Sequence, residues 1–285
     1  MTTSQSVYLN GQYMPLESAM IPVLDRGFIF GDGIYEVVPV YDRQPFRWPE
    51  HRARLRRSLA RISIADPMSD EQWRAIVTGL IERHPWSDQF VYLQITRGVA
   101  RRDHPFPKDA KPTVFAMTSE FVPMPAEKIE KGIDLISLPD ERWLNCDIKS
   151  VSLLGNVLAR QAAVDAGAFE CMMFRDGLLT EGSGSNIWIV RNGMVLSPHR
   201  DRRILEGIRV GLMEELCQAE GITLEMRNVA RHDVLHADEI LVTSATKEVI
   251  AATRLDGRPV GNGQPGPVFR RLHAAYQRAK QAAAG

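Results

Sequence analysis

Lys149 and Glu181 are the residues of this chain whose surroundings point most directly to chemistry. Lys149 lies in segment 146–150 (Cys-Asp-Ile-Lys-Ser), just before an apolar run with helical spacing, and Glu181 opens the Gly- and Ser-rich turn 181–186. An amine among apolar neighbours can form a Schiff base with an aldehyde, and a carboxylate can keep a pyridine nitrogen protonated. The two side chains together are therefore typical of an enzyme that carries pyridoxal 5′-phosphate.

The other lysines of the chain have no comparable setting. The sequence contains seven lysines in all. Six of them lie in polar or proline-rich stretches, after a Ser/Thr turn, or in the C-terminal tail: Lys108, Lys111, Lys128, Lys131, Lys247 and Lys280. The amine that would bind the cofactor aldehyde is therefore predicted to be Lys149.

Two places in the sequence suit a phosphate group. A helix predicted from Gly207 offers free backbone N–H groups and the positive end of its dipole, and segment 243–246 adds hydroxyl groups where a strand ends. Arg54 could supply a permanent cation. It lies in an arginine-rich predicted helix over 50–62, and such a helix usually presents its arginines to solvent, so spacing alone leaves the role of Arg54 open.

Composition argues against several classes of function. The formal net charge is zero, with 44% hydrophobic and 25% charged residues, so nothing favours binding to nucleic acid or to an anionic membrane. No apolar run approaches the ~20 residues that span a bilayer. The three cysteines, Cys146, Cys171 and Cys217, lack metal-type spacing, and their odd number argues against a disulfide framework. The pair His232 and His236 lacks a third ligand. We expect a cytoplasmic enzyme without a bound metal.

Hydrophobic periodicity predicts an α/β (α+β) protein with two domains. The predicted strands span 7–9, 12–14, 35–41, 45–47, 90–97, 113–118, 134–138, 171–174, 178–181, 186–190, 194–196 and 239–243. The predicted helices span 50–62, a segment opened by a capping box at Ser69, 151–166 with Leu154, Val157, Leu158 and Ala162 inward, and a segment from 207. The linker 121–125 (Phe-Val-Pro-Met-Pro) places the domains at 1–121 and 122–285, with Lys149 in the second, and residues 281–285 are expected to fray.

Five segments, in order along nearly the whole chain, resemble those of the fold-type IV pyridoxal phosphate enzymes. They are 25–36 (Asp-Arg-Gly-Phe-Ile-Phe-Gly-Asp-Gly-Ile-Tyr-Glu), 50–55 (Glu-His-Arg-Ala-Arg-Leu), 142–155 around Lys149, 181–186 (Glu-Gly-Ser-Gly-Ser-Asn) and 204–208 (Ile-Leu-Glu-Gly-Ile). Within this group, segments 142–155 and 96–104 (Thr-Arg-Gly-Val-Ala-Arg-Arg-Asp-His) are most similar to those of the D-amino acid aminotransferases. The resemblance implies a smaller N-terminal α/β domain, a larger C-terminal domain with a mixed sheet or barrel core, a cofactor in the cleft between them, and a homodimer.

The resemblance also implies a role for each matching position. Lys149 would form the Schiff base and carry the α-proton, and Glu181 would pair with the pyridine nitrogen. The phosphate would be bound, partly through backbone N–H groups, by Arg54, Ile208, Arg209, Ser244 and Ala245. The substrate carboxylate would be bound by Tyr35, Arg102 and His104, the last two from the partner subunit.

Three positions depart from the family pattern. Arg209 and Ala245 stand where the resemblance leads us to expect threonines, so two hydroxyl donors to the phosphate would be lost while backbone contacts persist. Gly184 stands where serine is expected, and its small size could widen the pocket. We therefore expect the chain to bind the cofactor, with an affinity that these changes could lower.

The resemblance implies a reversible ping-pong transfer of the amino group of a D-amino acid, such as D-alanine, to a 2-oxo acid, such as 2-oxoglutarate. Three alternatives share the fold and cofactor: a branched-chain L-amino acid aminotransferase, an (R)-amine transaminase and an aminodeoxychorismate lyase. A cofactor-free binding or scaffolding protein is the alternative from another class. The presence of both Lys149 and Glu181 argues against it.

Overall fold

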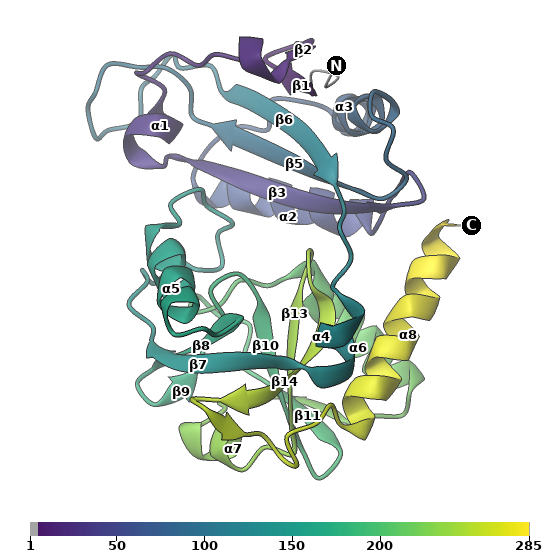
Figure 1. Ribbon diagram of the computed structural model, residues 1–285. Coiled ribbons are helices and arrows are strands. Elements are labelled where there is room, and N and C mark those ends of the chain that lie inside the picture. The colour runs from purple at the N-terminus through teal and green to yellow at the C-terminus, as the bar shows by residue number, and fades with distance from the viewer. Residues whose placement is uncertain (1–4, 285) are drawn as a thin grey trace. The chain divides into compact units, whose positions relative to one another are not determined.

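The computed structural model describes residues 5–284 and divides the chain into two compact units (Figure 1). The first unit runs up to Val122 and also contains Ile148–Ser152, and the second contains Pro123–Asp147 and Leu153–Ala282. The division therefore falls close to the predicted linker. The segment around Lys149 differs from the expectation, because it packs with the first unit rather than with the second.

The first unit is built on an antiparallel six-stranded sheet in the order β2-β1-β6-β5-β3-β4. Its strands are β1 (Ser6–Leu9), β2 (Gln12–Pro15), β3 (Gly33–Tyr41), β4 (Gln44–Pro45), β5 (Gln89–Thr96) and β6 (Thr113–Glu120). The predicted hairpin at its edge is confirmed: Asn10 and Gly11 have φ of 46° and 101°, as a tight turn between β1 and β2 requires.

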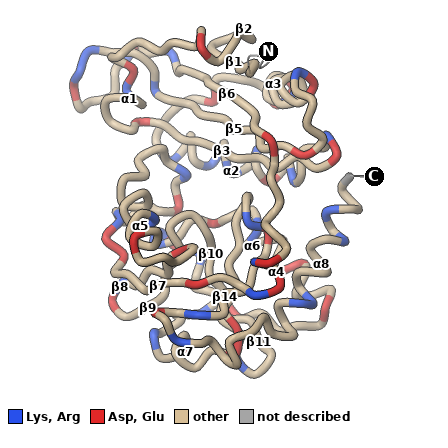
Figure 2. Tube along the Cα trace, viewed as in Figure 1, with Lys and Arg blue, Asp and Glu red and all other residues tan. Residues whose placement is uncertain are grey.

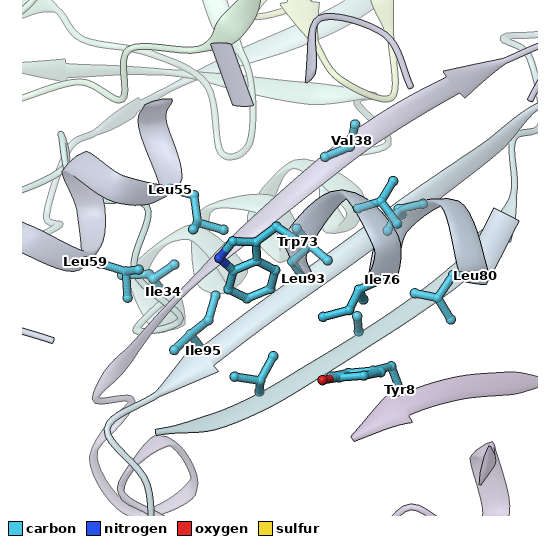
Figure 3. Close-up of a cluster of buried hydrophobic side chains, with 14 of the residues drawn as sticks. Tyr8, Ile34, Val38, Leu55, Leu59, Trp73, Ile76, Leu80, Leu93 and Ile95 are labelled. Atoms are coloured by element: carbon cyan, nitrogen blue, oxygen red, sulfur yellow. The ribbon is translucent and has the colours of Figure 1, made fainter. Parts of the chain in front are cut away.

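The core of the first unit lies between this sheet and two helices. The helices of the unit are α1 (Arg26–Phe30), α2 (Trp48–Arg61) and α3 (Asp70–Glu82), and a 3₁₀ turn, η1, spans Leu16–Ser18. Trp73 of α3 is fully buried among Leu55 and Leu59 of α2 and Leu93 of β5 (Figure 3). The predicted capping box opens α3, since the Ser69 side chain accepts from the Gln72 N–H and the Gln72 side chain accepts from the Ser69 N–H.

The second unit is built on a mixed nine-stranded sheet in the order β12-β11-β10-β13-β14-β7-β8-β9, with β15 paired to β14. Its strands are β7 (Ile133–Pro139), β8 (Glu170–Arg175), β9 (Leu178–Leu179), β10 (Asn186–Arg191), β11 (Met194–Ser197), β12 (Leu224–Met226), β13 (Glu239–Ser244), β14 (Glu248–Leu255) and β15 (Arg258–Pro259). β7 runs parallel to both β8 and β14, whereas β10, β13 and β14 pair antiparallel. The fold is therefore of the predicted α/β class.

Five helices belong to the second unit: α4 (Ala126–Lys131), α5 (Leu154–Asp165), α6 (Ile208–Ala219), α7 (Arg231–Leu235) and α8 (Pro267–Ala284). Helix α8 continues to Ala284, Gly285 lies outside the described residues, and the fraying expected over 281–285 stays a prediction. Basic and acidic residues are scattered over both units (Figure 2). Within residues 5–284, no helix has the length and apolar character needed to cross a membrane.

The prediction of the inward face of α5 was wrong. Leu154, Val157 and Leu158 are 71%, 59% and 62% exposed, and the buried residue of the helix is Ala163. Ala163 packs in a small cluster with residues of β8. A side of small residues therefore faces the sheet, which leaves the larger apolar side chains on the outside.

Candidate active site

Lys149 is fixed to strand β3 through its backbone. The Tyr35 N–H donates to the Lys149 carbonyl at 2.9 Å, the Val151 N–H donates to the Gly33 carbonyl at 3.1 Å, and Ser150 forms an antiparallel bridge with Ile34. The segment thus acts as a short extra strand beside β3. This pairing explains why α5 begins at Leu154 instead of near residue 151.

The structure brings Lys149 together with Tyr35, another predicted site residue. The Lys149 Nζ lies 4.2 Å from the centre of the Tyr35 ring, a cation–π distance. On the same sheet the Tyr35 ring stacks on Tyr92 at 5.8 Å, and burial raises the pKa of Tyr92 to about 12. The half-buried Lys149 therefore has its amine against the Tyr35 ring, which in turn stacks on Tyr92.

Arg54 is held by Glu36, which sequence reasoning had not singled out. The Arg54 Nε and Nη2 each donate to a Glu36 carboxylate oxygen at 2.7 Å, and His51 Nδ1 lies 2.8 Å from the same carboxylate. Burial acts to raise the pKa of Glu36, but the Arg54 guanidinium outweighs it and holds this pKa well below its ordinary value. Arg54 is therefore a buried, oriented cation rather than a solvated side chain of α2.

Glu181 lies in a dense hydrogen-bond network of the second unit. Its Oε1 accepts from Arg142 Nη1 at 2.5 Å, and its Oε2 accepts from the Leu205 N–H at 3.0 Å and from Asn186 Nδ2 at 3.4 Å. Burial raises the pKa of Glu181 to about 7, although Arg142 and the Leu205 N–H act to lower it. A carboxyl group poised near neutrality can share a proton with a ring nitrogen.

The first turn of α6 presents the predicted phosphate-binding residues Ile208 and Arg209. Gly207 precedes them, and among the described residues no side chain caps this turn. A Cβ on Gly207 would lie 2.3 Å from the Asn186 Oδ1, so a larger residue there would displace the Asn186 side chain. The buried Arg209 guanidinium lies 5.4 Å from the Tyr276 ring of α8.

Ser244 and Ala245, the other predicted phosphate-binding pair, form the turn between β13 and β14. The Ser244 Oγ accepts from the Lys247 N–H at 3.1 Å and lies 3.3 Å from the Thr246 Oγ1. These bonds organise the turn internally. Ser244 and Ala245 are both half-buried and reachable from solvent.

Arg102 and His104 lie in the loop between β5 and β6, which helix α1 anchors. The Arg26 guanidinium donates to the carbonyl of Asp103 at 2.5 Å and to that of His104 at 3.2 Å. The Phe30 ring lies 5.5 Å from the Arg102 guanidinium and 5.6 Å from the His104 ring. The two residues are thus brought together around Phe30, both exposed, whereas Tyr35 contacts Lys149 in a different part of the unit.

Sequence reasoning missed residues that form hydrogen bonds with these groups, with their partners or with their turns: Glu36, His51, Arg142, Glu170 and Lys247. Glu36 and His51 stand inside the family-like segments 25–36 and 50–55, so their position in a motif was the available signal. Arg142 also donates to Asp140 through Nε and Nη2, each at 2.9 Å.

Gly184, which stands where serine was expected, is exposed, and a Cβ there would meet nothing within 4 Å.

Residues 33–255 match the model of the amino-transferase class IV family, and the chain belongs to this family. Pyridoxal 5′-phosphate is the cofactor of these enzymes. Among relatives, the D-alanine aminotransferase of Bacillus licheniformis is 37% identical over 271 residues, which is 95% of each chain. The D-alanine aminotransferase of Staphylococcus aureus (strain MSSA476) is 34% identical over 275 residues, 96% of this chain and 97% of that one.

Solved structures share the fold at lower identity. The branched-chain amino acid aminotransferase of Escherichia coli superimposes with a TM-score of 0.92 at 23% identity, over 97% of this chain and 94% of that one. The branched-chain aminotransferase of the archaeon Thermoproteus uzoniensis, solved with norvaline, gives a TM-score of 0.89 at 24% identity, over 96% and 94%. This agreement establishes the fold-type IV architecture.

The backbone and side-chain groups described above fit pyridoxal 5′-phosphate. The uncapped first turn of α6 and a hydroxyl-bearing turn at Ser244 suit a phosphate. The buried Glu181 carboxylate, whose two oxygens are held by fixed donors, suits a protonated pyridine nitrogen. The amine of Lys149 suits an aldehyde carbon.

Proposed function

We propose that this chain is a pyridoxal phosphate-dependent transaminase that moves the amino group of a D-amino acid, such as D-alanine, to a 2-oxo acid, such as 2-oxoglutarate. The observation that carries the choice of substrate is the anchored loop with Arg102 and His104, held by the two Arg26 hydrogen bonds. A guanidinium and an imidazole held on one loop suit a substrate carboxylate. Identity of 34–37% to D-alanine aminotransferases over almost the whole chain supports the same substrate class.

Each proposed cofactor contact follows from a described environment. Bound pyridoxal phosphate supplies an aldehyde and a ring that withdraws electrons. Glu181, oriented by Arg142, holds the proton on the ring nitrogen. The phosphate would be held by backbone N–H groups of Ile208 and Arg209, by the Ser244–Ala245 turn, and by the Arg54 guanidinium that Glu36 orients.

Lys149 is the proposed catalytic base as well as the residue bonded to the cofactor. Its amine would accept the α-proton of the substrate and give it back during amino transfer, which requires a flexible side chain on a fixed backbone. The backbone is fixed by the Tyr35 N–H, and the amine at the end of the side chain lies over the Tyr35 ring. The fixed position of the substrate carboxylate, with Tyr35, Arg102 and His104 as its ligands, decides which enantiomer presents its proton to the amine.

A homodimer is part of the proposal. Several large apolar side chains are more than half exposed, among them Met20, Val23 and Phe28 in the first unit and Leu154 and Leu158 in the second. Large apolar side chains left exposed in one chain can be covered by a second subunit. Arg102 and His104 are exposed on the loop beside Phe30, as expected of residues that reach into a partner's site.

Cytoplasmic location is proposed from the cysteines. Cys146, Cys171 and Cys217 are all free and buried. Unpaired buried thiols are typical of proteins that work in a reducing compartment.

The proposed activity is tested with purified holoenzyme and 2-oxoglutarate as acceptor. D-alanine and L-alanine are supplied separately, and pyruvate and the chirality of the glutamate formed are measured. We expect pyruvate and D-glutamate from D-alanine alone. Turnover of L-amino acids alone would assign the chain to the branched-chain type, and pyruvate formation without an oxo acid from aminodeoxychorismate would assign it to the lyases.

A further inference from the structure

The carboxylate of Glu170, at the start of β8, is fully buried and accepts five hydrogen bonds. Its donors are the Ser183 hydroxyl at 2.5 Å, the Ser183 N–H at 3.2 Å, the Ser185 hydroxyl at 3.1 Å, the Cys171 N–H at 2.9 Å and the Lys247 ammonium at 3.0 Å. Two of the donor residues belong to the turn that follows Glu181. The carboxylate therefore fixes that turn.

The fifth donor comes from a different loop. Lys247 follows the Ser244–Ala245 turn, and its own N–H donates to the Ser244 Oγ at 3.1 Å. The side chain of Lys247 is 15% exposed and its partner Glu170 is 0% exposed. One ion pair therefore joins the loop of the proposed pyridine contact to the loop of the proposed phosphate contact.

The charges of this pair depend on each other. Burial acts to raise the pKa of Glu170, but the Lys247 ammonium and the Ser183 hydroxyl outweigh it, so this pKa lies below its ordinary value. Removal of one member would leave the other charge buried without its counterpart, which is strongly destabilising for the local structure. The pair thus holds the two loops in one arrangement.

The residue after Lys247 shows that the turn is held from its other side as well. Glu248 has a φ of +55°, an uncommon conformation for a residue other than glycine. Its carboxylate accepts from Gln277 Nε2 at 2.8 Å and from Lys280 Nζ at 2.9 Å, both on α8. The turn 244–248 is therefore clamped between α8 and Glu170.

We propose that Lys247 is a positioning residue for the cofactor: its ion pair with Glu170 holds the Ser244–Ala245 turn in the shape that accepts the phosphate, while Glu170 fixes the turn that carries Glu181. The inference rests on the proposed function, in which these two turns bind pyridoxal 5′-phosphate. The Lys247 ammonium is directed to Glu170, so it acts through the carboxylate. Fixing both loops in advance lowers the entropy that cofactor binding must remove.

The test is a titration of apoprotein with pyridoxal 5′-phosphate, followed by quenching of tryptophan fluorescence. We expect Lys247→Met to raise the dissociation constant of the cofactor about tenfold or more. Lys247→Arg should keep it within about threefold of the wild-type value. Lys131→Met is the matched control, because Lys131 also forms an ion pair, with Glu127 on α4, but is 72% exposed. It should bind the cofactor like the wild type.

A double-mutant cycle separates positioning from general stability. Glu170→Gln should weaken binding to a similar degree, and Lys247→Met in that background should add little. Wild-type affinity for the cofactor in Lys247→Met would overturn the inference, even if the melting temperature of the apoprotein fell. Additive effects of Glu170→Gln and Lys247→Met on the dissociation constant would also overturn it. Failure of the wild type to bind the cofactor would instead refute the proposed function.

Discussion

The Arg142 guanidinium donates to the Glu181 carboxylate at 2.5 Å, and both side chains are almost completely buried. Arg142 also binds Asp140, so one cation stands between two carboxylates. The Glu181 carboxyl keeps a pKa raised to about 7 by burial despite this partner. Arg142 therefore orients the group that is proposed to face the cofactor nitrogen, and burial sets how readily that group takes up a proton.

This raised pKa predicts a pH dependence of stability in the apoprotein. Between the ordinary value of 4.5 and about 7, folded Glu181 holds a proton that the unfolded chain has released. The free energy of unfolding should therefore fall as the pH rises through this window, by up to about 1.4 kcal/mol per pH unit from this group. Urea unfolding of the wild type and of Glu181→Gln across the window measures the difference in slope. Identical slopes would show that Glu181 does not titrate there.

The Glu36–Arg54 pair makes a prediction about stability. Glu36→Ala removes the buried carboxylate partner of a guanidinium that is 5% exposed, and we expect a loss of about 3–5 kcal/mol in the free energy of unfolding. Glu127→Ala, which breaks an exposed pair with Lys131, should cost less than about 1 kcal/mol. Urea denaturation of both apoproteins gives the comparison. Equal losses would mean that the Glu36 pair contributes no more than a surface contact.

Arg102 is predicted to act on substrate rather than on cofactor. Arg102→Ala should raise the KM for D-alanine about tenfold to a hundredfold, the effect of losing one charge-assisted hydrogen bond, while the dissociation constant of pyridoxal phosphate stays the same. Arg101→Ala is the control, since Arg101 is an exposed neighbour in the same loop. Steady-state kinetics and a cofactor titration provide the two readouts. An unchanged KM would remove Arg102 from the carboxylate site.

Local signals allowed much of the fold to be predicted from the sequence. The Asn10-Gly11 hairpin and the capping box at Ser69 are encoded by adjacent residues, and both are confirmed. The predicted inward face of α5 was wrong. An apolar stripe on a helix indicates a face that is covered by other apolar groups, but it does not show which part of the protein covers it. In the structure Ala163 faces the sheet and Leu154 does not.

The candidate site also contains residues that the sequence predicted and residues whose partners it could not predict. Lys149 and Glu181 stand in recognisable segments, and the structure places each in an environment that suits its predicted chemistry. The residues that orient them could not be paired from the sequence. Glu170 and Lys247 are 77 residues apart along the chain, and the fold of the second unit brings them to 3.0 Å.

The most direct test of the central claim is a half-reaction without any oxo acid. Holoenzyme is mixed with D-alanine or with L-alanine, and the absorption of the bound cofactor is followed in the wild type and in Lys149→Ala. We predict conversion to the aminated cofactor with D-alanine alone in the wild type, and a conversion slower by several orders of magnitude in Lys149→Ala. Conversion by L-alanine alone, or unimpaired conversion in Lys149→Ala, would contradict the account.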